Sequence, residues 1–128
     1  MTKTILFLII LILLINFRVI LVSSAEQEYF IMISTGYCPC EKCCYPHADG
    51  ITFTGAEAGK GCIAIDPDAR ILRMGQKLYI DGYGYGIAND VGGAIKGWEV
   101  DLCFDTHQEA LAWGVRKVKV YIILKEGK

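Results

Sequence analysis

The sequence has no excess of positive charge, little proline and no repeats. Its 128 residues carry 13 Lys and Arg against 14 Asp and Glu, which argues against a strongly basic nucleic-acid-binding protein. Intrinsic disorder is excluded because 53% of the residues are hydrophobic and only 21% are charged. Neither an internal repeat nor a low-complexity linker is found, so one domain is expected. Fourteen glycines against three prolines favour β-structure with many tight turns.

An apolar segment opens the chain. Lys3 precedes an unbroken apolar run over residues 5–15, and small residues lead up to Ala25. A positive start, a short apolar core and small residues at its end are typical of a secretory signal peptide, here cleaved after Ala25. The folded domain would then be residues 26–128.

Two other interpretations of residues 1–25 remain open. An uncleaved membrane anchor over residues 5–22 would carry Asn16 and Arg18 into the bilayer, which is costly. The third interpretation is a helix buried in the folded domain. The signal peptide and the anchor both predict an exported protein, secreted or held in the cell envelope, that contacts a membrane only through this segment.

The rest of the chain alternates short strands with turns. Strands are expected where β-branched and aromatic residues cluster between glycines, over residues 28–35, 51–54, 62–66, 77–80, 83–89, 99–104 and 117–124. Residues 36–50 are expected to form a loop. Thr106 and Glu109 have capping-box spacing, which predicts a short helix that ends at Gly114. Six or seven short strands with one helix indicate a mainly β fold, a small barrel.

Three carboxylates stand where the pattern otherwise favours burial. Asp66 follows an apolar strand, Asp90 ends another, and Asp101 interrupts an apolar run. Because a carboxylate out of water is costly unless it is hydrogen-bonded or protonated, the three indicate a shared site. The alternative for Asp66 and Asp90 is that they merely begin turns. Asp101 has no turn-forming neighbour.

The order of residues around these aspartates resembles the 3D-domain family, which is named for three aspartates and includes the catalytic domain of membrane-bound lytic transglycosylase A. The resemblance covers about residues 33–124, nearly the whole chain after the apolar segment. Its segments are Ala64-Ile65-Asp66-Pro67, Tyr79-Ile80-Asp81-Gly82-Tyr83-Gly84, Asn89-Asp90-Val91-Gly92-Gly93-Ala94-Ile95-Lys96-Gly97, Val100-Asp101 and Ala112-Trp113-Gly114. Two features depart from the family pattern: Val91 stands where many members have Thr, and residues 68–75 are about two residues longer.

The resemblance implies a double-psi β-barrel that cleaves peptidoglycan glycan strands at a site of Asp66, Asp90 and Asp101. It makes Asp101 the acid that protonates the leaving oxygen and then the base for the C6 hydroxyl, giving a 1,6-anhydro product. This chemistry needs no cofactor and no metal. Other functions remain open: a barrel that binds cell-wall glycan without cutting it, or a glycoside hydrolase of the same fold.

Six further residues are candidates for substrate binding. The resemblance suggests substrate binding for Thr52 and Thr54. Gly92 and Gly93 would allow the backbone to approach a sugar closely. Lys96 and Trp98 follow in the same segment, and Trp98 could stack on a sugar face. Their ordinary alternatives are strand threonines, an exposed loop charge and aromatic packing.

The cysteines allow several interpretations. Four crowd the loop at 38–44, and Cys62 and Cys103 lie on separate expected strands. Export favours disulfides, although six cysteines permit 15 pairings. A structural zinc site in the loop, with His47 as a further ligand, and free thiols are the alternatives. His107 is expected to be exposed in the first turn of its helix.

Overall fold

The computed structural model describes residues 2–22, 27–44, 46 and 48–124, with the side chains of the first helix described up to Ile15. Its elements follow one another in this order: α1 (Thr2–Val22), β1 (Tyr29–Tyr37), α2 (Glu41–Cys44), β2 (Cys62–Ile65), the 3₁₀ turn η1 (Pro67–Ala69), β3 (Lys77–Ile80), β4 (Gly84–Val91), β5 (Glu99–Cys103), α3 (His107–Trp113) and β6 (Arg116–Ile123).

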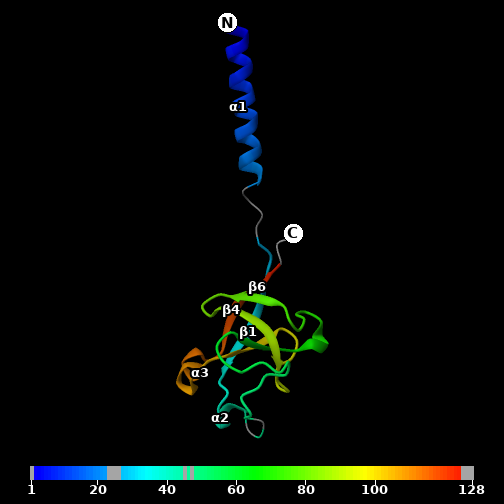
Figure 1. Cartoon of the computed structure of the whole chain (residues 1–128), viewed down its shortest axis with the longest axis vertical. Helices are drawn as coiled ribbons and strands as arrows, with labels where there is room; N and C mark the ends of the chain where they lie inside the picture. Colours follow the sequence, from blue (N-terminus) through cyan, green and yellow to red (C-terminus); the bar gives the residue numbers. More distant parts are fainter. Residues whose placement is uncertain (1, 23–26, 45, 47, 125–128) are drawn as a thin grey trace.

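Six strands close into one barrel in the order β1-β5-β2-β4-β3-β6 (Figure 1). The pairs β1/β5 and β2/β4 are parallel, and the other four pairs are antiparallel. Strands distant in the chain are therefore neighbours, and a closed barrel leaves no sheet edge unpaired. The mainly β fold of about six strands is confirmed, while the double-psi connectivity stays a prediction.

The barrel interior holds the apolar side chains of alternating strand positions. On β5, Val100 and Leu102 are fully buried, whereas Asp101 between them is half-buried. Successive side chains of a strand point to opposite faces, so Asp101 points away from the core. All four residues of β2 are buried, whereas each of the other strands has exposed or half-buried positions.

Helix α3 lies against β1 and begins as its sequence predicts. The Thr106 hydroxyl accepts a hydrogen bond from the Glu109 amide at 3.2 Å, and the Glu109 carboxylate accepts one from the Thr106 amide at 3.1 Å. The predicted capping box is confirmed. A Cβ on Gly36 would lie 2.8 Å from the carbonyl oxygen of Ala110. Because Gly36 has no side chain, α3 can approach β1 closely at this position.

Two of the expected segments differ from the structure. Residues 51–54 form a turn, and an isolated bridge joins Ile51 to Glu57. The segment is no strand because the Thr52 hydroxyl accepts the Ala56 amide at 3.2 Å and closes the backbone on itself. The strand expected at 51–54 is therefore wrong. The loop expected at 36–50 contains one helical turn, α2, and β1 extends into its start as far as Tyr37.

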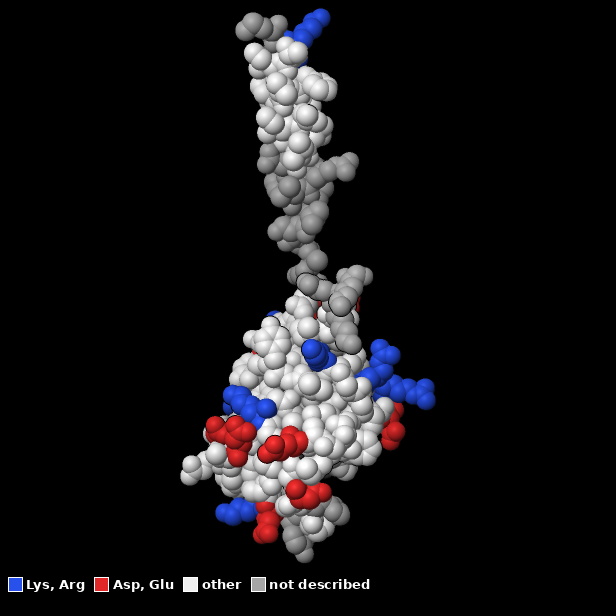
Figure 2. All heavy atoms as spheres, in the orientation of Figure 1, with Lys and Arg blue, Asp and Glu red and all other residues white. Residues whose placement is uncertain are grey.

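Helix α1 stands apart from the barrel (Figure 1). The apolar side chains from Ile5 to Ile15 have exposed fractions between 44% and 68%. No helix in the described part of the chain combines the length and hydropathy needed to cross a bilayer. The expected cleavage site at Ala25 lies outside the described residues, so the signal peptide and the anchor stay predictions. On the face shown in Figure 2, charges of both signs are interspersed over the barrel.

Candidate active site

The strand register brings Asp90 and Asp101 to either side of one small residue. Asp101 on β5 pairs with Ala64 of β2, and Asp90 on β4 pairs with the same Ala64 across a register shift. Since neighbouring strands are about 4.8 Å apart, the two Cα atoms lie about 10 Å from each other. Each side chain is half-buried. These two of the three predicted carboxylates therefore lie close together.

Asp101 faces a cleft of about 430 Å³. The Thr35 hydroxyl donates a hydrogen bond to its Oδ1 at 2.9 Å. Burial raises the pKa of the Asp101 carboxyl, and the charge of Asp90 raises it further, although the Thr35 hydrogen bond opposes both. The cleft walls come from β1, β5, α2, the loop after β4 and the turn between α3 and β6, and they are Ile33, Thr35, Gly36, Tyr37, Cys43, Ala94, Ile95, Glu99, Asp101 and Val115. A carboxyl with a raised pKa at a cleft is suited to carry a proton.

Three hydrogen bonds fix the carboxylate of Asp90. The Tyr37 hydroxyl donates to its Oδ2 at 2.7 Å, and the amides of Phe53 and Val91 donate to its Oδ1 at 3.0 and 2.9 Å. Burial, followed by the hydrogen bond to Asp90, raises the pKa of Tyr37 well above its ordinary value. Tyr37 therefore stays protonated and donates to Asp90 at all ordinary pH values.

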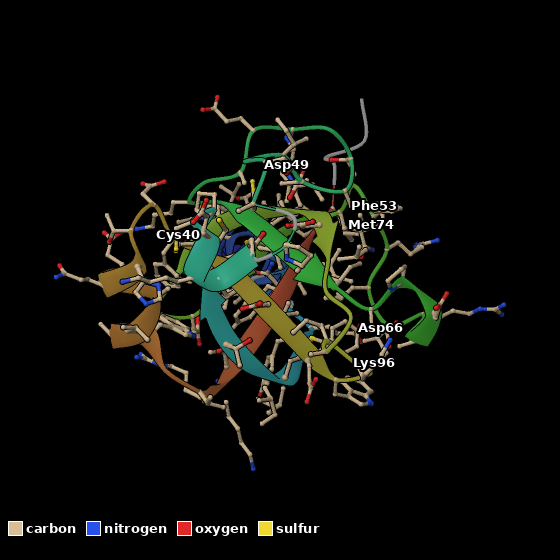
Figure 3. The ribbon with its side chains drawn as sticks, turned by 90° about the horizontal axis from the view of Figure 1, so that it is seen from below. Cys40, Asp49, Phe53, Asp66, Met74 and Lys96 are labelled. Atoms are coloured by element: carbon tan, nitrogen blue, oxygen red, sulfur yellow. The ribbon has the colours of Figure 1, made fainter. Side chains whose placement is uncertain are left out.

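Asp66 belongs to a different network. Its Oδ2 accepts the Gly97 amide at 2.9 Å, and its Oδ1 accepts the Asp68 amide at 3.2 Å, where it caps η1. The Gly97 amide and, less strongly, the charge of Lys96 lower the pKa of Asp66. Figure 3 shows Asp66 and Lys96 side by side. Asp66 begins a turn, as its alternative interpretation holds, and its place in a shared site stays a prediction.

The two threonines flank the backbone amide that reaches Asp90. Thr52 is buried, and its hydroxyl lies 3.3 Å from that of Thr54. Thr54 is exposed, and its amide donates to the carbonyl of Asn89 at 3.2 Å. Thr52 therefore holds the turn together, while Thr54 is accessible beside Asp90.

The loop after β4 borders the cleft of Asp101. Gly92 turns the chain, since its carbonyl accepts the Ile95 amide at 3.0 Å, and a Cβ there would lie 2.9 Å from Ile95. Gly93 is exposed and has open space around it. Lys96 is exposed, and Trp98 is 52% exposed with its ring 5.8 Å from that of Phe30. Gly93, Lys96 and Trp98 are thus accessible to a ligand.

Sequence reasoning did not identify Thr35 and Tyr37 as partners of the aspartates. They stand two apart on β1, and strand residues two apart share one face. Polar side chains at alternate positions of an otherwise apolar strand were the available signal. Thr35 meets Asp101 because β1 pairs with β5, and Tyr37 reaches Asp90 on β4, two strands beyond β5 in the barrel; no local pattern contains this strand order.

All six cysteines are free thiols in the structure, so the disulfides expected from export are not shown. Cys62 and Cys103 are buried in the barrel. His47 lies outside the described residues. His107 is half-buried and its Nδ1 lies within 3.7 Å of three cysteine sulfurs. The expectation that His107 is exposed is therefore wrong, because α3 packs its first turn against the cysteine-rich loop.

Comparison with known proteins agrees with the aspartate pattern. Residues 61–124, which hold all three aspartates, match the model of the 3D domain. The chain belongs to the 3D domain family. The cell wall-binding protein YocH of Bacillus subtilis (strain 168) is 38% identical over 78 residues, covering 58% of this chain and 26% of that protein.

Two further proteins are similar over part of their length. The putative cell wall shaping protein YabE of the same organism is 37% identical over 91 residues, covering 70% of this chain and 22% of that protein. This chain thus spans about a quarter of the length of the curated relatives it matches. The crystal structure of MltA from E. coli has 22% sequence identity and a TM-score of 0.48, over 59% of this chain and 28% of that chain.

Proposed function

We propose that this chain is an exported lytic transglycosylase that cleaves the β-1,4 bond between N-acetylmuramic acid and N-acetylglucosamine in peptidoglycan. The observation that carries the proposal is the position of Asp101, a half-buried carboxyl with a raised pKa that lines a cleft. The names of its two Bacillus relatives, which refer to the cell wall, support the same substrate and an envelope or secreted location.

The reaction proceeds in two proton transfers through one carboxyl. Protonated Asp101 gives its proton to the glycosidic oxygen as the bond from C1 to that oxygen breaks. The Asp101 carboxylate then takes the proton of the C6 hydroxyl of the muramic acid, whose oxygen forms the new bond to C1. No water is consumed, no cofactor is needed, and the product is the 1,6-anhydro sugar.

Asp90 supplies the negative charge of the site. Held by Tyr37 and two backbone amides, it keeps the pKa of Asp101 raised and stabilises the positive charge that develops at C1. Asp66, which is turned toward the Gly97 amide, would order the loop at 92–97. In this proposal that loop and Thr54 hold the sugar, with Trp98 stacking on one of its faces.

A second candidate function is binding of wall glycan without cleavage. The name of the relative YocH, a cell wall-binding protein, favours it. Asp101 discriminates the two functions, since a binding module has no need of a half-buried carboxyl with a raised pKa. In a pure binding module Asp101→Asn would leave the affinity for glycan unchanged and no product would ever form.

Digestion of purified peptidoglycan by the full chain, followed by mass spectrometry of the fragments, tests the proposal. We expect 1,6-anhydro muropeptides from the wild type and none from Asp101→Asn. Thr35→Val, which removes only the hydrogen bond to Asp101, should retain cleavage. Fragments with ordinary reducing ends would identify a hydrolase, and binding to the sacculus without fragments would identify the binding module.

A further inference from the structure

Three thiols and one imidazole converge at one corner of the barrel. Cys38 follows β1, Cys40 and Cys43 lie on either side of the start of α2, and His107 is the first residue of α3. One ligand atom from each of the four lies within 4.8 Å of every other. Figure 3 shows Cys40 next to α3, on the opposite side of the barrel from Asp66.

The distances fit a tetrahedral metal ion. Zinc bonds of about 2.3 Å to sulfur and 2.0–2.1 Å to nitrogen place a tetrahedral S···N pair about 3.6 Å apart and an S···S pair about 3.8 Å apart. The Nδ1 of His107 lies 3.4 Å from the sulfur of Cys43 and 3.7 Å from those of Cys38 and Cys40. The sulfurs of Cys38 and Cys43 are closer, at 3.1 Å, and would separate by about 0.7 Å around a metal ion.

Local backbone structure explains why these four residues meet. The amides of Cys43 and Cys44 both donate to the carbonyl of Cys40, at 3.1 and 3.0 Å, which bends the chain so that Cys40 and Cys43 present their sulfurs together. Gly36 brings α3 against the end of β1, and this places His107 over the loop. Cys44 is outside the cluster, because its thiol donates to the carbonyl of Cys38 at 3.2 Å.

We propose that Cys38, Cys40, Cys43 and His107 bind one structural Zn²⁺ ion. Thiolate and imidazole are donors that suit zinc, and four protein ligands leave no open coordination position, as in structural zinc sites. The three cysteines bind as thiolates, so metal binding releases whatever protons they carry. The three cysteines precede the segment that matches the family model, which begins at residue 61, and the metal site does not depend on the proposed enzymatic function.

The metal would join the loop after β1 to α3 at the wall of the cleft. Cys43 lines the same cleft as Asp101, and Cys38 directly follows Tyr37, the hydroxyl donor to Asp90. A zinc ion would therefore restrain the segment that carries Tyr37. Its role is to position that segment, and binding of the ion is measured independently of any cleavage.

Metal content of the full chain tests this proposal. The protein is purified with a phosphine reductant, incubated with Zn²⁺, desalted and analysed by inductively coupled plasma mass spectrometry. We expect one zinc ion per chain. Replacement by Co²⁺ should give a thiolate-to-cobalt charge-transfer band and the intense visible bands of tetrahedral coordination. If the protein is isolated with a Cys38–Cys43 disulfide, it is reduced before zinc is added. Wild-type protein that takes up no zinc once it is reduced would overturn the proposal.

Variants identify the ligands. Cys40→Ser and His107→Ala should lose zinc, whereas Cys44→Ser, from the same loop, should retain it. His107→Cys should bind again, with the cobalt spectrum shifted to that of four thiolates, which separates loss of a ligand from loss of the fold. Full zinc content and an unchanged cobalt spectrum in His107→Ala, or equal zinc loss in Cys44→Ser and Cys40→Ser, would contradict the assignment.

Discussion

Gly36 is the position at which the smallest change should have a large effect. Substitution by alanine adds a single Cβ that would lie 2.8 Å from the carbonyl oxygen of Ala110, 3.1 Å from the ring of Phe104 and 3.2 Å from the Cα of Ala110. Two of these three atoms are backbone, which cannot rotate away as a flexible side chain can. Helix α3 must therefore move outward from β1.

The expected cost is that of an overpacked interior, about 1–3 kcal/mol of the free energy of unfolding. For a domain of this size each kcal/mol lowers the melting temperature by roughly 4–8 °C. Gly93→Ala is the matched control, since a Cβ there meets no atom within 4 Å. The control should leave stability unchanged or raise it by about 0.4–1 kcal/mol, because alanine restricts the unfolded chain.

Urea unfolding followed by circular dichroism measures both variants, and the two transitions should share one m-value. We expect the midpoint of Gly36→Ala to fall clearly below that of the wild type, and that of Gly93→Ala to stay level or rise. Equal midpoints for Gly36→Ala and Gly93→Ala would mean that α3 does not require a glycine beneath it.

Three further predictions concern the site and the helix. Asp90→Asn removes a charge that raises the pKa of Asp101. Activity is lost as pH rises because Asp101 loses its proton, so this loss should begin at lower pH in the variant than in the wild type. An unchanged pH profile would argue against an interaction between Asp90 and Asp101. Tyr37→Phe deletes a hydrogen bond to a carboxylate and should lower the free energy of unfolding by about 1.5–3 kcal/mol in urea titrations; no change would mean that the bond is unimportant. Thr106→Ala should cost about 1 kcal/mol through the lost cap, while Thr106→Ser, which keeps the hydroxyl, should cost little; an equal loss in both would contradict the capping box.

Local features of the fold could be predicted because their causes are local. Residues 77–80 alternate apolar and polar side chains, and β3 has these bounds. The spacing of Thr106 and Glu109 was sufficient for the start of α3, because both capping hydrogen bonds form within one turn. The strand expected at 51–54 failed because a hydroxyl of the same segment offered the backbone another partner.

Contacts across the barrel could not be predicted in the same way. Asp90 and Asp101 lie close because both pair with Ala64, and strand order is a property of the whole chain. His107 lies against Cys43 although 64 residues separate them. The capping box determines where its helix begins but carries no information about the surface that the helix covers.

A carbon-13 NMR titration of the aspartate side-chain carboxyls tests whether Asp101 holds its proton above the ordinary pH range of an aspartate. The spectra of the wild type and of Asp101→Asn are compared across the same pH series. We expect one wild-type resonance whose titration midpoint lies above the ordinary value of about 3.9 and which is absent from the spectrum of Asp101→Asn. If the resonance lost in Asp101→Asn titrates at or below that value, Asp101 is not the acid.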